Sequence, residues 1–474
     1  MPPERLHKAL IIIMLGLLTV SAFFIRLYNF KHSELRSIDE VVYYRMALQV
    51  LEEGPTGYHT IPYGLELAAT GRPLPPYFFQ PLFKHPPLFT FLVSGALQLF
   101  GKTMTSAAYV SLLFGVLMIP LTYMLGTLIF GKEIGLLAAL FMWLDPVNII
   151  CSQKVWMETT LSFFSILAIY FFLRAFMHKK DTFYFWAGIA AGTALLTKYT
   201  GILAWVVILA FAVVFERDLF KNKRFVLSLA VPFMMFIPWV YWNFFVYGRD
   251  IFTSNLQIHN LSFGRPRTIM LLGLIVLFFC LGAWKLFKPA QRKSRDDRLV
   301  QSTGWDTVRK YAVIFCGCLL LWKTRGSVMR GLDFTSLPVT SWAQGIFWGA
   351  PSTFYFGRLI EFSLLFIFSF FAFFFFPSQN FEKKRMFFLT ASLYILFFMV
   401  WGSVQSRYLL PAIPFLIILG VAFVAELFAV VSGSKNLMLC FGGRFLLRAV
   451  ILYAVLKTYL IDIMLSFPNN MCYF

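Results

Sequence analysis

The feature that most constrains this chain is a succession of apolar runs, each able to cross a bilayer, joined by short connections. A crossing takes about 20 mostly apolar residues. Such runs begin near Ala9, Thr105, Ile134, Val155, Phe183, Thr200, Phe225, Thr268, Tyr311, Phe354, Met386, Tyr408 and Leu446. Backbone groups inside a bilayer must be paired within the protein, and helices achieve this most simply. Only 14% of the residues are charged, against about 25% in soluble domains. We therefore predict an all-α integral membrane protein with about 11–13 spanning helices.

The positive charges indicate how these spans are oriented. With a cytoplasmic N-terminus, the cytoplasmic connections contain clusters at Lys132, at 174–180, at 217–224, at 285–298, at 383–385 and at 435–444. The opposite connections are poorer in cations, and Lys154, Lys198 and Arg407 stand nearly alone there. Cytoplasmic loops of membrane proteins collect Lys and Arg in this way. The pattern accounts for the net charge of +20 without a nucleic-acid partner.

The distribution of polar residues divides the chain into four parts. We expect an N-terminal anchor helix over residues 1–32, a first extracytoplasmic loop over 33–103, a multi-span membrane core over 104–431, and a C-terminal span and tail over 432–474. The first apolar run follows Arg5 and Lys8 and lacks a small-residue cleavage site, which favours an uncleaved anchor. A long polar loop in so apolar a chain is the natural place for chemistry, and we expect it to be partly helical.

An acidic pair, Asp39-Glu40, lies near the start of that loop. Ser37 and Glu40 have the spacing of a capping box, in which each side chain bonds to the other residue's backbone N–H. The helix would end at Gly54-Pro55, a normal stop signal. Both carboxylates would then only complement the helix dipole. Asp39, however, is not needed for the cap, and a carboxylate just above the membrane can act as a general base. The spacing alone favours neither interpretation.

The same loop closes with Lys84-His85-Pro86-Pro87 before an apolar run that ends at Phe100. Proline is tolerated in the first turn of a helix, so a stiff helix start explains the prolines. The functional alternative places Lys84 and His85 beside a phosphate, as cation and hydrogen-bond donor.

Three further charged residues stand at the expected outer ends of spans: Glu158, Lys198 and Arg407. An ordinary explanation exists for each, since Glu158 can pair with Lys154 one turn earlier and a long cation can reach the interface. Charged residues at the edges of spans nevertheless tend to face cavities. Together they look like a site for an anionic substrate. Carboxylates with His85 could hold a divalent cation, but no ligand spacing demands one, and the six cysteines have no metal-type or disulfide-framework spacing.

Five short motifs in a fixed order carry a resemblance to a known class of enzymes. They are Asp39-Glu40-x-x-Tyr43-Tyr44, His85-Pro86-Pro87-Leu88, Glu158 with 161–164, 196–199, and 406–411 with Pro414. The chain resembles the GT-C membrane glycosyltransferases from residue 10 to about 431, in the branch of protein O-mannosyltransferases and aminoarabinose transferases. Two details depart from the usual pattern, since His85 stands between Lys84 and the prolines, and Glu158 replaces a common Asp.

The resemblance implies a GT-C-like helix bundle that transfers a sugar from a polyprenyl-phosphate donor to an extracytoplasmic acceptor, with inversion at the anomeric carbon. It implies Asp39 as general base. Phosphate contacts are then expected from Lys84, His85, Lys198, Arg407 and Tyr408, and acceptor contacts from Glu40, Tyr44 and Glu158. The expected location is a bacterial-type plasma membrane, with the active site on its periplasmic or extracellular side.

Two other functions compete with a glycosyltransferase. A flippase or transporter of lipid-linked glycans would need charged residues near the middle of the bilayer, whereas the charges singled out here lie at the outer ends of spans. A membrane scaffold whose first loop binds a partner would need no catalytic carboxylate. The sequence identifies neither the sugar nor the acceptor.

Overall fold

The computed structural model describes residues 3–31, 37–55, 85–248, 322–333, 354–375, 381–400, 405–433 and 437–466. Within these residues every regular element is a helix. Each expected span start falls on or within a few residues of a helix, except those near Thr268 and Tyr311, which lie outside the described residues. The prediction of an all-α membrane protein is therefore confirmed.

Five of the described helices are long and apolar enough to cross a membrane. Their spanning segments are Arg5–Tyr28 in α1 (Pro3–Lys31), Met104–Phe130 (α5), Glu158–His178 (α8), Lys223–Phe245 in α11 (Lys223–Tyr247) and Ile413–Ser432 (α19). The segments in α1 and α11 are mostly exposed, whereas those in α5, α8 and α19 are more than half buried. Exposed apolar helix faces at the periphery suit contact with lipid.

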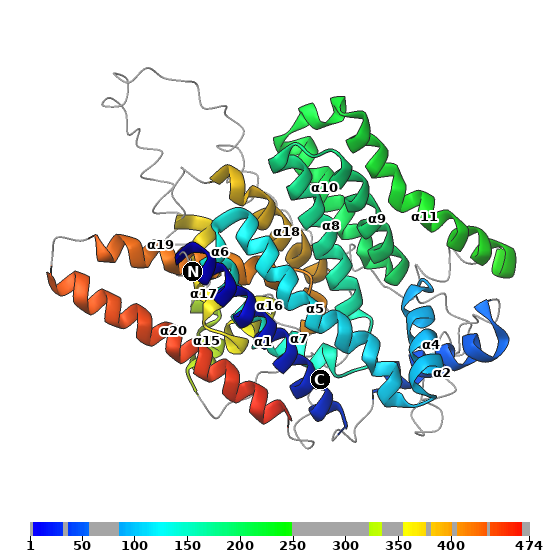
Figure 1. Cartoon of the computed structure of the whole chain (residues 1–474), viewed down its shortest axis with the longest axis horizontal. Coiled ribbons are helices and arrows are strands. Elements are labelled where there is room, and N and C mark those ends of the chain that lie inside the picture. Colours follow the sequence, from blue (N-terminus) through cyan, green and yellow to red (C-terminus); the bar gives the residue numbers. More distant parts are fainter. Residues whose placement is uncertain are drawn as a thin grey trace.

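Besides α2 (Ile38–Glu53), α4 (Leu88–Phe100), α6 (Lys132–Trp143) and α7 (Pro146–Ser152), further helices complete the bundle around this buried centre. They are α9 (Thr182–Thr197), the 3₁₀ turn η3 (Tyr199–Gly201) with α10 (Ile202–Phe215), η4 (Arg217–Lys221), α15 (Arg325–Leu332), α16 (Phe354–Phe362), α17 (Leu365–Phe375), α18 (Phe381–Val400) and α20 (Leu437–Ser466). Helix α8 packs on α9, α9 on α11, and α17 on α19. Figure 1 shows α11 and α20 at opposite edges, with α5 and α8 between them.

One expected span is broken in two. The run that starts near Ile134 forms α6 (Lys132–Trp143) and α7 (Pro146–Ser152), which meet at an angle of 57°. Asp145 caps α7 by accepting from the backbone N–H of Asn148 at 2.7 Å, and Pro146 follows in the first turn. Proline lacks the N–H that a continuous helix would need. The bend turns α7 so that the segment after it meets the start of the short helix α2.

The acidic pair sits on a short helix outside the spans, α2 (Ile38–Glu53). The capping box between Ser37 and Glu40 is present, and α2 ends at Gly54, whose positive φ of 81° suits glycine. The apolar face of α2 packs on α4 (Leu88–Phe100), which begins after Pro87 as expected. We call the end of the bundle that carries α2 and the first turn of α8 the α2 end. Because α8 runs from there to His178, the basic connection at 178–180 lies at the opposite end.

Helices α5 and α6 approach closely through glycine, which generates a testable prediction. A Cβ at Gly135 would collide with Thr127 Oγ1 and lie 2.7 Å from the carbonyl oxygen of Tyr123. Gly135→Ala is expected to destabilise the protein by about 1–3 kcal/mol, the usual effect of overpacking. The matched control is Gly95→Ala in α4, because a Cβ there meets no atom within 4 Å. Thermal unfolding in detergent should give a lower melting temperature for Gly135→Ala alone. Equal melting temperatures for both variants would contradict the close approach.

Candidate functional site

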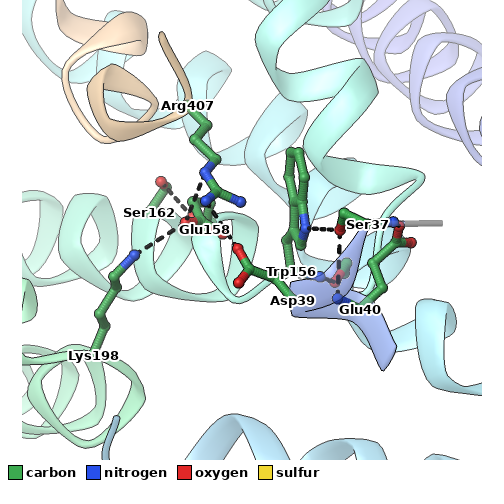
Figure 2. A network of polar contacts seen from close by, with 9 residues as sticks. Ser37, Asp39, Glu40, Trp156, Glu158, Ser162, Lys198 and Arg407 are labelled. Carbon is green, nitrogen blue, oxygen red and sulfur yellow. Dashed lines mark hydrogen bonds and ion pairs between the residues drawn. The ribbon is translucent and has the colours of Figure 1, made fainter. Parts of the chain in front are cut away.

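A network of ion pairs joins four elements at the α2 end. Arg407, in the 3₁₀ turn η8 (Ser406–Leu409), donates from Nη2 to Asp39 Oδ2 at 3.0 Å. Its Nε lies 3.6 Å from Glu158 Oε1, in the first residue of α8. Lys198, directly after α9, donates to the same Glu158 oxygen at 3.0 Å. Figure 2 shows Asp39, Glu158 and Lys198 pointing toward one another around Arg407.

The members of the network differ in how far solvent reaches them. The side chain of Glu158 is 5% exposed and those of Lys198 and Arg407 are 14% and 15% exposed, whereas that of Asp39 is 24% exposed. Burial lowers the pKa of Arg407, but the nearby Glu158 and Asp39 carboxylates outweigh it and raise this pKa well above its usual value. The guanidinium is therefore charged, and Asp39 is the most accessible group that it holds.

Aromatic rings also contact the two cations. The Arg407 guanidinium lies 4.3 Å from the ring centre of Trp156, and Lys198 Nζ lies 5.1 Å from that of Tyr408. Tyr408 itself stacks on Phe398 with 5.2 Å between ring centres. Cations over aromatic faces are attracted by the ring quadrupole. The Arg407 guanidinium also lies 5.6 Å from the ring centre of Tyr408, so the ring of this residue, expected as a phosphate contact, lies beside both cations.

Glu40 has a different role from its neighbour in the sequence, and Figure 2 shows the two side chains pointing apart. Glu40 is fully buried. It accepts from the backbone N–H of Ser37 at 2.7 Å and of Val155 at 3.2 Å, and Lys154 Nζ lies 3.7 Å away. The carboxylate that completes the cap therefore also holds the segment between α7 and α8. This position favours a structural role for Glu40 over the expected acceptor contact.

The ordinary explanation of Glu158, an ion pair with Lys154, does not hold in the described residues. Lys154 lies in the segment between α7 and α8, before α8 begins. The two residues are therefore not one turn apart on the same helix. Its side chain approaches Glu40, and the cations on Glu158 come from Lys198 and Arg407 instead. Glu158 also lies at the N-terminus of α8, where the helix dipole favours a carboxylate.

Sequence reasoning missed Trp156. Its indole N–H donates to Ser37 Oγ at 3.0 Å, and its backbone exchanges two hydrogen bonds with the hydroxyl of Ser111 in α5. The Trp156 side chain thus connects the N-terminal cap of α2 with the guanidinium of Arg407. No local pattern marks this residue, because each contact joins segments far apart in the chain.

The other predicted residues lie around or outside this network. The buried His85 packs its ring 5.9 Å from that of Tyr43, the α2 residue one turn after Asp39. Tyr44 points elsewhere, since its hydroxyl donates to the backbone carbonyl of Lys102 at 2.8 Å. Lys84 lies outside the described residues. The structure thus brings together Asp39, Glu158, Lys198, Arg407 and Tyr408, with His85 near α2 and Tyr44 apart.

The network predicts strong coupling between Glu158 and Lys198. Removing one partner of a buried pair leaves a charge without compensation and costs about 3–5 kcal/mol. Glu158→Gln and Lys198→Met should therefore each lower the free energy of unfolding. The double variant should lose less than the two single losses added together, by about 0.5–3 kcal/mol. Unfolding of the four proteins measures this coupling.

The matched control is the exposed pair of Lys102 and Glu52, with 2.9 Å between Nζ and Oε1. Exposed pairs are worth about 0.2–1 kcal/mol at most, so the same cycle there should show weak coupling. Equal coupling in the two cycles would contradict a buried network.

Comparison with known proteins by sequence gives one family. Residues 84–242 match the family model described as dolichyl-phosphate-mannose-protein mannosyltransferase. This segment contains Glu158 and Lys198, whereas Asp39 and Arg407 lie outside it. No curated protein matches the chain.

Solved structures extend the likeness over the whole fold. ArnT from Cupriavidus metallidurans in the apo state gives a TM-score of 0.57 at 16% identity, over 98% of this chain and 76% of ArnT. ArnT bound to undecaprenyl phosphate gives 0.53 at 16% identity over the same shares. Archaeal oligosaccharyltransferase AglB from Archaeoglobus fulgidus, in complex with an inhibitory peptide and a dolichol-phosphate, gives 0.58 at 17% identity, over 97% of this chain and 56% of AglB. Residues 84–242 therefore resemble the protein mannosyltransferase family, as the motifs indicated, and the chain has an all-α membrane fold like that of ArnT and AglB.

Proposed function

We propose that this chain is a glycosyltransferase that moves a sugar from a polyprenyl-phosphate donor to an acceptor outside the cytoplasm. The observation that carries the proposal is the ion network of Asp39, Arg407, Glu158 and Lys198 at one end of the bundle. One of the ArnT structures contains undecaprenyl phosphate, and the AglB structure contains a dolichol-phosphate. We propose as its location a bacterial-type plasma membrane, with the site on the periplasmic or extracellular face.

The two cations have donors to spare for a phosphate. Among the described residues, Arg407 Nη1 donates no hydrogen bond, and Lys198 Nζ bonds only to Glu158. Both side chains remain partly exposed. A phosphate beside them would receive charge-assisted hydrogen bonds, which are about twice as strong as neutral ones.

The reaction needs one base and one stabilised leaving group. Asp39, the most accessible carboxylate of the network, accepts the proton of the acceptor hydroxyl as its oxygen bonds to the anomeric carbon. The bond from that carbon to the donor phosphate breaks, and the polyprenyl phosphate leaves with the electron pair. Arg407 and Lys198 stabilise the charge that develops on it. Attack opposite the leaving group inverts the anomeric carbon in a single step.

The charge balance of the network supports this assignment. In the resting network two carboxylates balance two cations. When Asp39 takes the proton, the network becomes positive at the moment at which the departing phosphate gains a negative charge. Proton transfer and departure of the lipid phosphate therefore assist each other.

The transport alternative has less support. Transporters of lipid-linked substrates need charges near the middle of the bilayer. In the described residues, the network just analysed instead lies at helix ends, in the first residue of α8 and just after α9.

Asp39→Asn tests the proposed reaction. It keeps the shape of the side chain but removes the base, which is worth about 10²–10⁴-fold in rate. Mass spectrometry of envelope glycoconjugates should show one added sugar in cells with the wild type and none with Asp39→Asn. The matched control, Glu53→Gln, changes an exposed carboxylate at the far end of the same helix and should leave transfer intact. Transfer at the wild-type level by Asp39→Asn would exclude it as the base.

Lys198→Met tests the phosphate contact. A charge-assisted hydrogen bond contributes about 1.5–3 kcal/mol, so the Kd of a soluble short-chain polyprenyl phosphate should rise by about 10–100-fold. Calorimetry in detergent measures it. Lys221→Met, an exposed lysine of η4 at the opposite end, is the control and should bind as the wild type does. An unchanged Kd for Lys198→Met would contradict the contact.

A further inference from the structure

Arg407 stands between two carboxylates that come from different parts of the chain. One of its nitrogens lies 3.0 Å from Asp39 in α2, and another lies 3.6 Å from Glu158 in α8. Figure 2 shows the guanidinium where the two acidic side chains converge. Carboxylates that converge from separate elements are an arrangement that divalent cations such as Mg²⁺ and Mn²⁺ use.

The surroundings do not fit a divalent ion while the arginine is present. The guanidinium rests on Trp156, and its position is held by both carboxylates. Lys198 places a second positive charge on Glu158. Across the described ranges, no group of three or more His, Cys, Asp or Glu side chains could hold a metal ion. A divalent ion at this position would have two carboxylates and water as its ligands, and in the wild type it would have to displace Arg407 and lie beside Lys198.

We propose that the guanidinium of Arg407 takes the place of a divalent cation between Asp39 and Glu158, so that this chain transfers sugar without a metal ion. The statement about the reaction rests on the proposed function, whereas the statement about ion binding does not. The arginine keeps the two carboxylates together as an ion would. Its remaining N–H groups supply the positive charge that faces the leaving phosphate.

Electron paramagnetic resonance of added Mn²⁺ tests ion binding without any substrate. We expect the wild type and Asp39→Asn to bind the same amount of Mn²⁺, because no ion binds at Asp39 while Arg407 is present. Arg407→Ala opens the space between the carboxylates and is expected to bind one Mn²⁺. The double variant Arg407→Ala/Asp39→Asn is expected to lose it. Size-exclusion profiles and melting temperatures establish that each variant is folded.

Two results would overturn the proposal. Mn²⁺ bound by the wild type and lost in Asp39→Asn would show that the site takes a metal beside the arginine. A folded Arg407→Ala that binds no Mn²⁺ would show that the carboxylates do not form a cation position. If Arg407→Ala fails to fold, the wild type and Asp39→Asn still test whether the site takes a metal ion beside the arginine.

Transfer assays provide a second measurement. The wild type is expected to keep its full rate in EDTA and to gain nothing from added Mg²⁺ or Mn²⁺. Loss of transfer in EDTA that Mg²⁺ restores would overturn metal independence. If no transfer occurs under any condition, the proposed function fails, and the Mn²⁺ titration still gives its own answer.

Discussion

The ion pair between Asp39 and Arg407 joins two segments that are 368 residues apart in the chain. Removing two charges from water is costly, and a partly buried pair persists only where further contacts compensate both partners. Here Glu158 and the Trp156 ring also hold Arg407. The packing of α2, α8 and η8 at one end of the bundle therefore decides whether Asp39 and Arg407 meet. The site depends on the whole fold.

A second group of contacts sets the direction of Asp39. Glu40 ties the start of α2 to the segment between α7 and α8 through Val155 and Lys154, and Trp156 bonds to Ser37 from the same segment. The bend at Asp145 brings this segment to the α2 end. With Glu40 turned inward, its neighbour Asp39 faces Arg407. The two carboxylates of the acidic pair thus differ: Glu40 positions the helix, and Asp39 remains accessible.

Local physics accounts for what could be predicted from the sequence. The cap at Ser37, the end of α2 at Gly54 and the start of α4 after Pro87 each follow from neighbouring residues, and the structure contains all three. The pairing of charges could not be predicted in this way. A rule for helical neighbours joined Glu158 to Lys154, but the two residues belong to different elements. Their true partners depend on how distant helices pack. Trp156 escaped notice for the same reason.

The balance of charges also supports the proposed reaction, in which one arginine serves both reacting groups. Two carboxylates balance two cations in the network, so Asp39 is held without a large excess of positive charge. Such an excess would make the Asp39 carboxylate a weaker base. In the proposed reaction, protonation of Asp39 weakens its ion pair with the guanidinium, and the same cation becomes available to the leaving phosphate. A metal ion between the carboxylates would carry twice the charge and would oppose the proton transfer more strongly. An arginine at this position therefore suits a reaction in which base and leaving group must change charge together.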